Sequence, residues 1–238
     1  MKNFRPVKNK RTSERIAQQI ERAILSGTMR QGDRLSPERE LVEQFKASRI
    51  SIREAIKSLE TSGLLMIKPG SGVFVAKVNS KPMSKTLSSI LRIQKTSINE
   101  LTEARVILEP TIAKLAAEKI TPEDLVRLDQ NIQEASKIVK SNSPSPEQNI
   151  EFHSLLAAAT HNQVITLSMK TLLDVVKEMT LEITDNLPKR IKISRHAVDF
   201  HKKILKALRE KDSQKVHDLM LNQILQIQGG LKKVKSNS

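Results

Sequence analysis

The strongest constraint on the fold lies in residues 13–75, where three short helical patterns precede a turn between two apolar runs. Residues 13–26, "SERIAQQIERAILS", place apolar side chains at the i, i+4, i+7 and i+8 spacing of one helix face, and Gly27 ends the pattern. A second short pattern follows in "LSPEREL", and Ser48 is placed to cap a third helix that ends near Gly63. Next, "LLMI" and "VFV" flank "KPGSG", whose Pro and Gly favour a tight turn. The order predicts a winged helix-turn-helix of three helices and a β-hairpin wing.

The remainder of the chain is predicted to be helical. Side chains typical of helix starts stand at Ser97, Thr121 and Ser145, and further helical patterns run through residues 163–184, 194–210 and 213–228. No alternation of the β type follows Val75. We therefore expect a mainly α protein, in which an all-α antiparallel helical bundle follows the winged helix-turn-helix.

Changes in pattern suggest the domain boundaries. Residues 78–85 lack apolar periodicity and contain a proline, which indicates a linker. Gly229 and Gly230 are the expected end of the last helix. The predicted organisation is a DNA-binding domain at 1–77, a linker at 78–85, a ligand-binding and dimerisation domain at 86–230, and a basic tail at 231–238.

The composition limits the classes of partner that the chain can bind. The formal net charge of +15 favours a polyanion, either nucleic acid or an anionic membrane surface, and residues 1–80 carry 16 basic against 8 acidic side chains. No apolar run reaches the ~18 residues of a membrane span, and the first 15 residues are polar, so we expect a cytoplasmic protein that does not use a membrane. The absence of cysteine excludes disulfides and thiolate metal sites, and the absence of Trp and Tyr argues against base stacking on an aromatic platform.

The third predicted helix has a cationic face beside its apolar face. At 100° per residue, the apolar side chains of residues 52, 55, 56 and 59 share one arc, and a different arc carries Arg49, Ile50, Arg53 and Lys57. A merely solvated face is one interpretation, since exposed charge usually contributes little. The alternative is DNA binding, because this end of the second helix of a helix-turn-helix enters the major groove, where Arg pairs with guanine O6 and N7. We favour DNA binding.

The stretch "GDRLSPERELVEQFKASRISIREAIKSLETSGLLMIKPGSGVFV" resembles the DNA-binding domain of GntR-family bacterial transcription regulators. The resemblance implies that Arg39, Ser48, Arg49 and Arg53 contact an operator and that Gly70 brings the wing tip to the minor groove. Arg49, in the first helical turn, is our choice for base reading, while the other side chains are better placed for phosphates or a second base edge. Because one recognition helix reads few base pairs, the resemblance also implies a homodimer on a palindromic operator.

Residues 85–228 resemble the all-helical effector domain of the FadR subfamily, called FCD, through "EARVILEPTIAKLAAE", "NIEFHSLLAAATHN" and "FHKKILKALREKD". Many members hold a divalent metal with an Asp and a His one helical turn apart and two later histidines. The corresponding positions here read Asn149, His153, His201 and Gln223. Carboxamides at two of the four positions leave His153 and His201 as the remaining metal ligands, for which zinc or nickel would be the ions.

Three interpretations of this site remain open. The two histidines hold a metal, or they are ordinary interhelical histidines, or the site binds an organic anion directly. We favour the third, since Arg105 can pair with a carboxylate while Asn149, His153, His201 and Gln223 can donate hydrogen bonds. The chain is then expected to be a ligand-responsive transcriptional regulator, with repression favoured over activation. A metal-dependent enzyme, which lacks a candidate nucleophile here, and an unspecific nucleic-acid packaging protein are the rival functions.

Overall fold

The computed structural model describes residues 12–77, 79–183 and 187–235. Residues 1–11 of the predicted DNA-binding domain and the last three residues of the predicted tail lie outside the described residues. The chain divides into two compact units between Pro82 and Met83. Among the described residues, no helix is both long and apolar enough to span a membrane.

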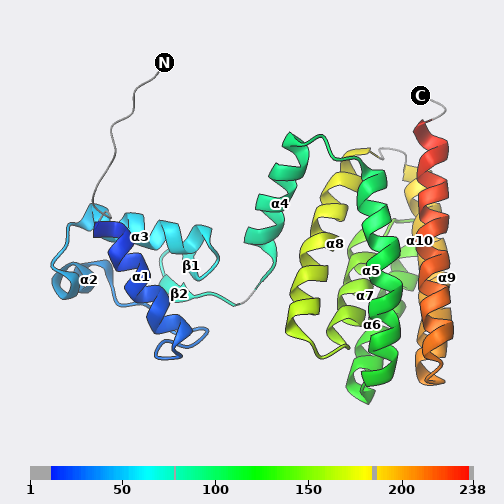
Figure 1. The fold of residues 1–238 in the computed structure, drawn as a ribbon, viewed down its shortest axis with the longest axis horizontal. Coiled ribbons are helices and arrows are strands. Elements are labelled where there is room, and N and C mark those ends of the chain that lie inside the picture. Colours follow the sequence, from blue (N-terminus) through cyan, green and yellow to red (C-terminus); the bar gives the residue numbers. More distant parts are fainter. Residues whose placement is uncertain (1–11, 78, 184–186, 236–238) are drawn as a thin grey trace. The chain divides into compact units, whose positions relative to one another are not determined.

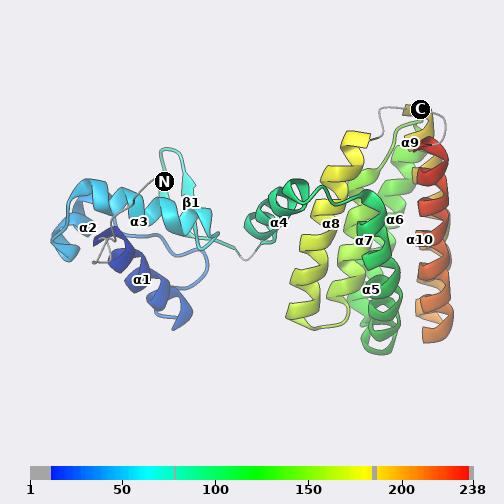
Figure 2. The same cartoon turned by 45° about the horizontal axis from the view of Figure 1, so that its top comes forward.

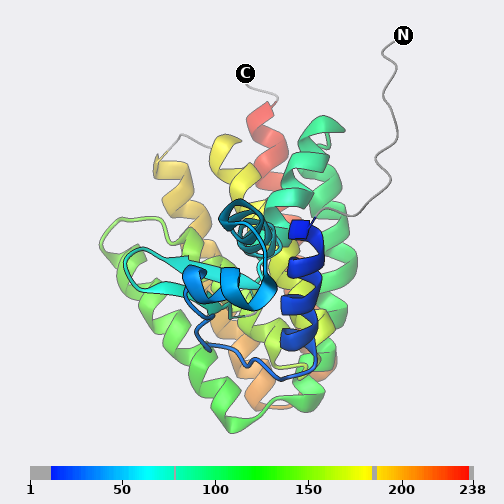
Figure 3. The ribbon, with the colours of Figure 1, turned by 90° about the vertical axis from the view of Figure 1, so that its left-hand side faces the viewer.

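The N-terminal unit contains the predicted three helices and hairpin (Figure 1). Its elements are α1 (Thr12–Leu25), α2 (Glu38–Phe45), α3 (Arg49–Thr61), β1 (Leu65–Lys68) and β2 (Gly72–Val75). The two strands pair antiparallel, with Leu65 opposite Val75 and Lys68 opposite Gly72. Figure 3 shows this hairpin, in cyan, extending beyond the helices of its unit. The winged helix-turn-helix fold is confirmed.

The core of this unit is made by the apolar faces that the sequence predicts. Ile16 and Ile20 of α1 are buried together with Ile52 and Leu59 of α3 and with Leu41 of α2. Ser48 caps α3, since its Oγ accepts a hydrogen bond of 3.1 Å from the backbone N–H of Ser51. The packed core fixes α3, so that its opposite arc faces away from the interior.

The C-terminal unit is an all-helical bundle, which Figures 1 and 2 show from two directions. Its helices are α4 (Lys81–Ile93), whose first two residues still belong to the N-terminal unit, α5 (Ile98–Lys119), α6 (Pro122–Lys140), α7 (Pro146–Ala158), α8 (Gln163–Ile183), α9 (Leu187–Arg209) and α10 (Ser213–Lys235). Helices begin after Ser97, Thr121 and Ser145, as predicted. Ser97 with Glu100 and Thr121 with Asp124 form complete capping boxes, whereas the side chain of Ser145 makes no capping hydrogen bond. The main core joins α5, α6, α7, α9 and α10 around the fully buried Phe152.

Two predicted boundaries differ from the structure. The expected linker at 78–85 is shorter, because α4 begins at Lys81 with Pro82 in its first turn, where a missing N–H costs no helical hydrogen bond. Leu87 and Leu91 of α4 pack against α5 and α8, and this tertiary packing stabilises the helix. The expected helix end at Gly229 and Gly230 is wrong, since α10 continues to Lys235. Glycine lowers helix stability without excluding helical dihedral angles.

Candidate nucleic-acid interface and buried polar cluster

The exposed arc of α3 carries the side chains that the sequence predicts to meet DNA. Ile50 is 71% exposed at the start of the helix, next to Arg49. Arg53 and Lys57 follow at one-turn intervals on the same arc, with side chains 71% and 74% exposed. The arc is therefore free to enter a groove of about the width of a helix.

Carboxylates hold three of the four predicted cations. Arg53 Nε donates to Glu38 Oε1 of α2 at 2.6 Å. Lys57 Nζ donates to Glu60 Oε2 at 2.6 Å, three residues further along α3. Arg39 Nε of α2 lies 3.7 Å from Glu43 Oε1.

Arg49 differs from these cations, because within the described part of the chain it forms no ion pair and no side-chain hydrogen bond. Its guanidinium is therefore free to pair with a base edge without first leaving a carboxylate. Arg53, by contrast, must exchange Glu38 for a DNA atom or keep Glu38 as its partner. The free guanidinium at the N-terminal turn of α3 supports Arg49 as the side chain for base reading.

The wing presents a glycine at its tip. Gly70 has a φ of +72°, a conformation that side chains rarely adopt, and a Cβ there would meet no atom within 4 Å. The turn itself requires the glycine, and open space beyond it leaves the backbone accessible. Lys68, at the end of β1, lies 4.8 Å above the ring of Phe74 and adds a cation to the hairpin.

In the helical unit, four helices bring polar side chains to a buried cluster. Arg105 comes from α5, His153 from α7, His201 from α9 and Gln223 from α10, and all four residues are at most 5% exposed. The rings of His153 and His201 are 5.3 Å apart between centroids, and Gln223 Nε2 lies 2.8 Å from His201 Nε2. Asn149 stands one turn before His153 on α7.

Glu109, which the sequence analysis did not single out, joins Arg105 to His153. Its side chain is 3% exposed, its Oε1 accepts from Arg105 Nε at 2.5 Å, and its Oε2 contacts His153 Nδ1. Burial alone would raise the pKa of Glu109, but the charges and hydrogen bonds of Arg105 and His153 outweigh it and lower the pKa to about 2. The interior therefore holds a carboxylate, which is paired with Arg105 and is not among the predicted site residues.

Whereas Glu109 is charged, His201 favours its neutral form. Burial lowers its pKa well below the ordinary value, the neighbouring His153 lowers it further, and Glu109 opposes this only in part. Its ring stacks on Phe152 with centroids 3.7 Å apart. A neutral His201 has one donor nitrogen and one acceptor nitrogen, and its Nε2 is already engaged by Gln223.

Each of the five predicted effector residues has a buried polar atom without a hydrogen-bond partner among the described residues. The atoms are Arg105 Nη2, Asn149 Oδ1, His153 Nε2, His201 Nδ1 and Gln223 Oε1. An unpaired buried donor or acceptor costs about 1–3 kcal/mol, so native proteins leave few of them. A concentration of donors and acceptors of this kind is suited to a polar ligand that pairs with several of them.

The side chains do not fit a divalent metal. Asn149 and Gln223 offer carboxamides, and Glu109 is engaged by Arg105 and His153. His201 Nε2 is hydrogen-bonded to Gln223. In the part of the chain that the structure describes, no group of three His, Asp or Glu residues is arranged to hold a metal ion.

The sequence gives only weak signals for Glu109 and Glu38, the carboxylates that pair with Arg105 and Arg53. Glu109 lies four residues after Arg105 inside an apolar stretch, the spacing at which opposite charges meet on a helix. Glu38 lies 15 residues before Arg53, and only the packing of α2 on α3 brings the two together. No spacing rule connects residues that far apart.

Two family models match the chain in separate segments. The model for bacterial regulatory proteins of the gntR family matches residues 12–75. The model for the FCD domain matches residues 100–225, which is more than half of the chain. These segments contain the DNA-binding arc and the buried cluster, respectively.

The chain is also similar to individual proteins. The HTH-type transcriptional regulator LutR of Bacillus subtilis is 33% identical over 67% of this chain and 71% of its own length. The uncharacterized HTH-type transcriptional regulator YcbG of the same organism is 31% identical over 89% of this chain and 86% of its own. The solved structure of a Streptococcus agalactiae GntR protein matches 90% of this chain and 98% of its own, with a TM-score of 0.69 and 28% identity.

Proposed function

The chain belongs to the GntR family of bacterial regulatory proteins and has an FCD domain, and on this premise we propose that it binds a palindromic operator as a homodimer. It is a transcriptional regulator and not an enzyme. The DNA contacts would come from Arg39, Ser48, Arg49, Ile50, Arg53, Lys57 and Gly70. Because the operator is DNA, the protein would act in the cytoplasm, where a bound dimer would repress transcription by covering the operator.

The observation that carries the DNA-binding assignment is the free guanidinium of Arg49 on the exposed arc of α3. A bidentate Arg–guanine pair discriminates between bases by about 1–3 kcal/mol, whereas a Lys–phosphate contact does not depend on sequence. We therefore assign base reading to Arg49 and phosphate binding to Lys57. Arg53 is assigned to a phosphate or a second base edge once Glu38 releases it.

Selection from a random duplex library would first define the operator, and the matched variants Arg49→Ala and Lys57→Ala would then be titrated on it and on a scrambled duplex. Arg49→Ala should lose about 1–3 kcal/mol on the operator with little change on the scrambled duplex. Lys57→Ala should weaken both complexes by similar factors. Equal losses on both duplexes for Arg49→Ala would refute the assignment.

For the helical domain, we propose that the buried cluster binds a small organic anion without a metal. Arg105 Nε is occupied by Glu109, so the anion would pair with Nη2, the unsatisfied guanidinium nitrogen. The unpaired oxygens of Asn149 and Gln223 accept hydrogen bonds, so they would pair with hydroxyl groups of the ligand, while the unpaired ring nitrogens of His153 and His201 would help to orient it. Binding and operator affinity would then be coupled reciprocally, which is the requirement for allostery.

A homodimer is supported by apolar side chains that the single chain leaves exposed. Ile107 and Leu108 of α5 are 70% and 43% exposed, whereas the other large apolar side chains of this helix are buried or half-buried. Exposed apolar surface on a helix of this kind is typical of a protein–protein contact. Sedimentation equilibrium of the wild type and of Ile107→Glu tests the point, since a monomeric wild type would exclude the dimer.

A further inference from the structure

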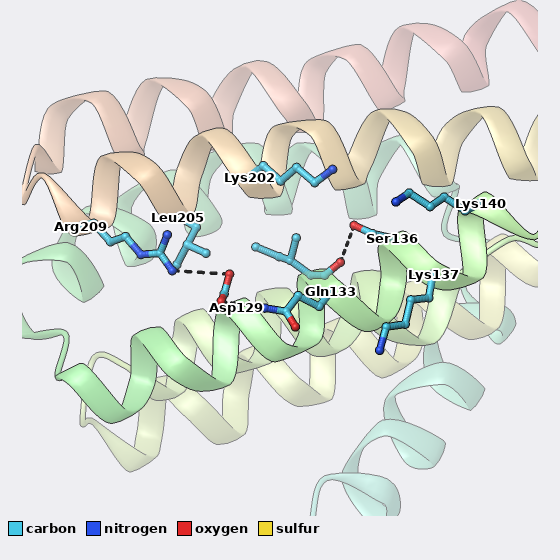
Figure 4. Close-up of a pocket in the computed structure, with 9 residues that line it drawn as sticks. Asp129, Gln133, Ser136, Lys137, Lys140, Lys202, Leu205 and Arg209 are labelled. Atoms are coloured by element: carbon cyan, nitrogen blue, oxygen red, sulfur yellow. Dashed lines mark hydrogen bonds and ion pairs between the residues drawn. The ribbon is translucent and has the colours of Figure 1, made fainter.

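A cleft of about 440 Å³ lies between α6 and α9, lined by residues that do not belong to the buried cluster (Figure 4). The buried side chains of Ile132 and Leu205, each 3% exposed, form its apolar floor. A volume of this size falls within the ~300–1,000 Å³ of small-molecule sites. The cleft can therefore hold a compact organic molecule.

At one end of the cleft, the polar side chains are paired with protein atoms. Arg209 Nη2 of α9 lies 3.5 Å from Asp129 Oδ1 of α6. Gln133 Nε2 donates to Asp129 Oδ2 at 3.0 Å, and Ser136 Oγ donates to the carbonyl oxygen of Ile132 at 2.7 Å. These polar groups require no ligand.

The other end carries uncompensated positive charge. Lys137 and Lys140 of α6 and Lys202 of α9 line the cleft, and none has an ion pair or side-chain hydrogen bond within the described chain. In Figure 4 the side chain of Lys202 extends toward the end of the cleft where Lys140 lies, while Lys137 is directed away from α9. An anionic group beside Lys140 and Lys202 would relieve the repulsion between the two ammonium groups.

We propose that this cleft is a second ligand site, which binds a small amphipathic anion. Its acid group would lie beside Lys140 and Lys202, and its apolar part would cover Ile132, Leu205 and the lysine stems. A nucleic-acid backbone fits less well, because it carries charge along its whole length and would place phosphates against Asp129. The site is independent of the proposed operator and of the buried cluster.

A local reporter can test the site, because the chain contains no Trp. Gln133 lines the cleft and is exposed, so Gln133→Trp places a single fluorophore there; Glu134→Trp, at the next exposed position outside the lining, is the matched control. The probe is octane-1-sulfonate below its micelle concentration, and inorganic sulfate tests whether the apolar part matters. Octane-1-sulfonate should give a saturable fluorescence change in Gln133→Trp only, and sulfate should not reproduce it.

Charge removal then assigns the acid group. In the Gln133→Trp background, Lys140→Gln with Lys202→Gln should weaken octane-1-sulfonate binding by about fivefold to tenfold. Lys119→Gln with Lys206→Gln removes the same charge from exposed positions outside the cleft and should leave binding unchanged. Absence of saturable binding, equal binding by the two double variants, or equal affinity for sulfate would each overturn the proposal. Loss of duplex-DNA affinity in the Lys140 and Lys202 variant without octane-1-sulfonate binding would instead indicate a polyanion surface.

Discussion

Exchanging Glu109 for glutamine removes one buried charge and leaves its cationic neighbour without a counter-ion. Arg105 is 5% exposed, so the variant would keep a buried guanidinium that has lost its carboxylate. A carboxylate whose pKa falls from 4.5 to about 2 on folding stabilises the folded state by about 3 kcal/mol at neutral pH. Breaking a buried ion pair by removing one partner costs a similar ~3–5 kcal/mol. Glu109→Gln should therefore destabilise the helical domain by about 3 kcal/mol.

Urea unfolding followed by far-ultraviolet circular dichroism measures this loss in the full chain. Because the chain has two compact units, two transitions are expected, and only that of the helical unit should shift. Glu118→Gln is the matched control, since Glu118 is exposed on the same helix and its exchange should change stability by less than about 0.5 kcal/mol. A loss below about 1 kcal/mol for Glu109→Gln would refute the structural role of the carboxylate.

The pH dependence has a definite sign. The folded-state pKa of Glu109 is lowered, so its stabilisation is complete above the unfolded value of 4.5 and disappears progressively as the pH falls toward 2. The difference in stability between wild type and Glu109→Gln should therefore be constant near neutral pH and shrink between pH 4.5 and 2. A difference that persists unchanged at pH 2.5 would contradict the ionised carboxylate.

Three further outcomes are expected. Glu38→Gln frees Arg53 from its ion pair. In anisotropy titrations at several salt concentrations, the variant should bind scrambled DNA more tightly, and the slope of log K against log[salt] should be steeper by about one. Weaker binding to scrambled DNA would contradict this prediction. Gly63→Ala should destabilise the N-terminal unit by about 1–3 kcal/mol in thermal unfolding, because the new Cβ would lie 2.5 Å from Pro82 Cγ. Gly27→Ala is the control and should cost less, because Gly27 has a similar φ but open space around it. Effector affinity in the helical domain should be equal with and without a chelator, and its loss on metal removal would refute direct anion binding.

Local signals in the sequence predict the fold well where one side chain determines one feature. The capping boxes at Ser97 and Thr121 and the Pro–Gly turn of the wing are such signals, and each is present in the structure. The start of α4 depends instead on Leu87 and Leu91 packing against other helices, which no local pattern announces. The proline there and the glycine pair in α10 predict boundaries, although both residue types are compatible with these helical positions.

The buried cluster was only partly predictable for a related reason. The sequence predicts its five residues. In the structure Glu109 joins Arg105 to His153, the rings of His153 and His201 are neighbours, and Gln223 is hydrogen-bonded to His201. Glu109 does not belong to the metal-ligand pattern that the resemblance implies, so that pattern gives no reason to expect a carboxylate there. Its spacing from Arg105 was visible, but exposed pairs of that spacing are common and only burial distinguishes this one.

The ion pairs on the winged domain give a physical reason why a chain of net charge +15 can bind DNA selectively. Arg39, Arg53 and Lys57 are already paired with carboxylates, so a phosphate gains each cation only by displacing a Glu and returning it to water. This exchange lowers the sequence-independent part of the affinity, which phosphate contacts supply. Arg49 needs no such exchange, so its contribution to DNA affinity is not reduced in this way. If the proposed roles hold, the ratio of specific to unspecific binding rises, because the proposed base-reading cation is free and the proposed phosphate-binding cations are restrained.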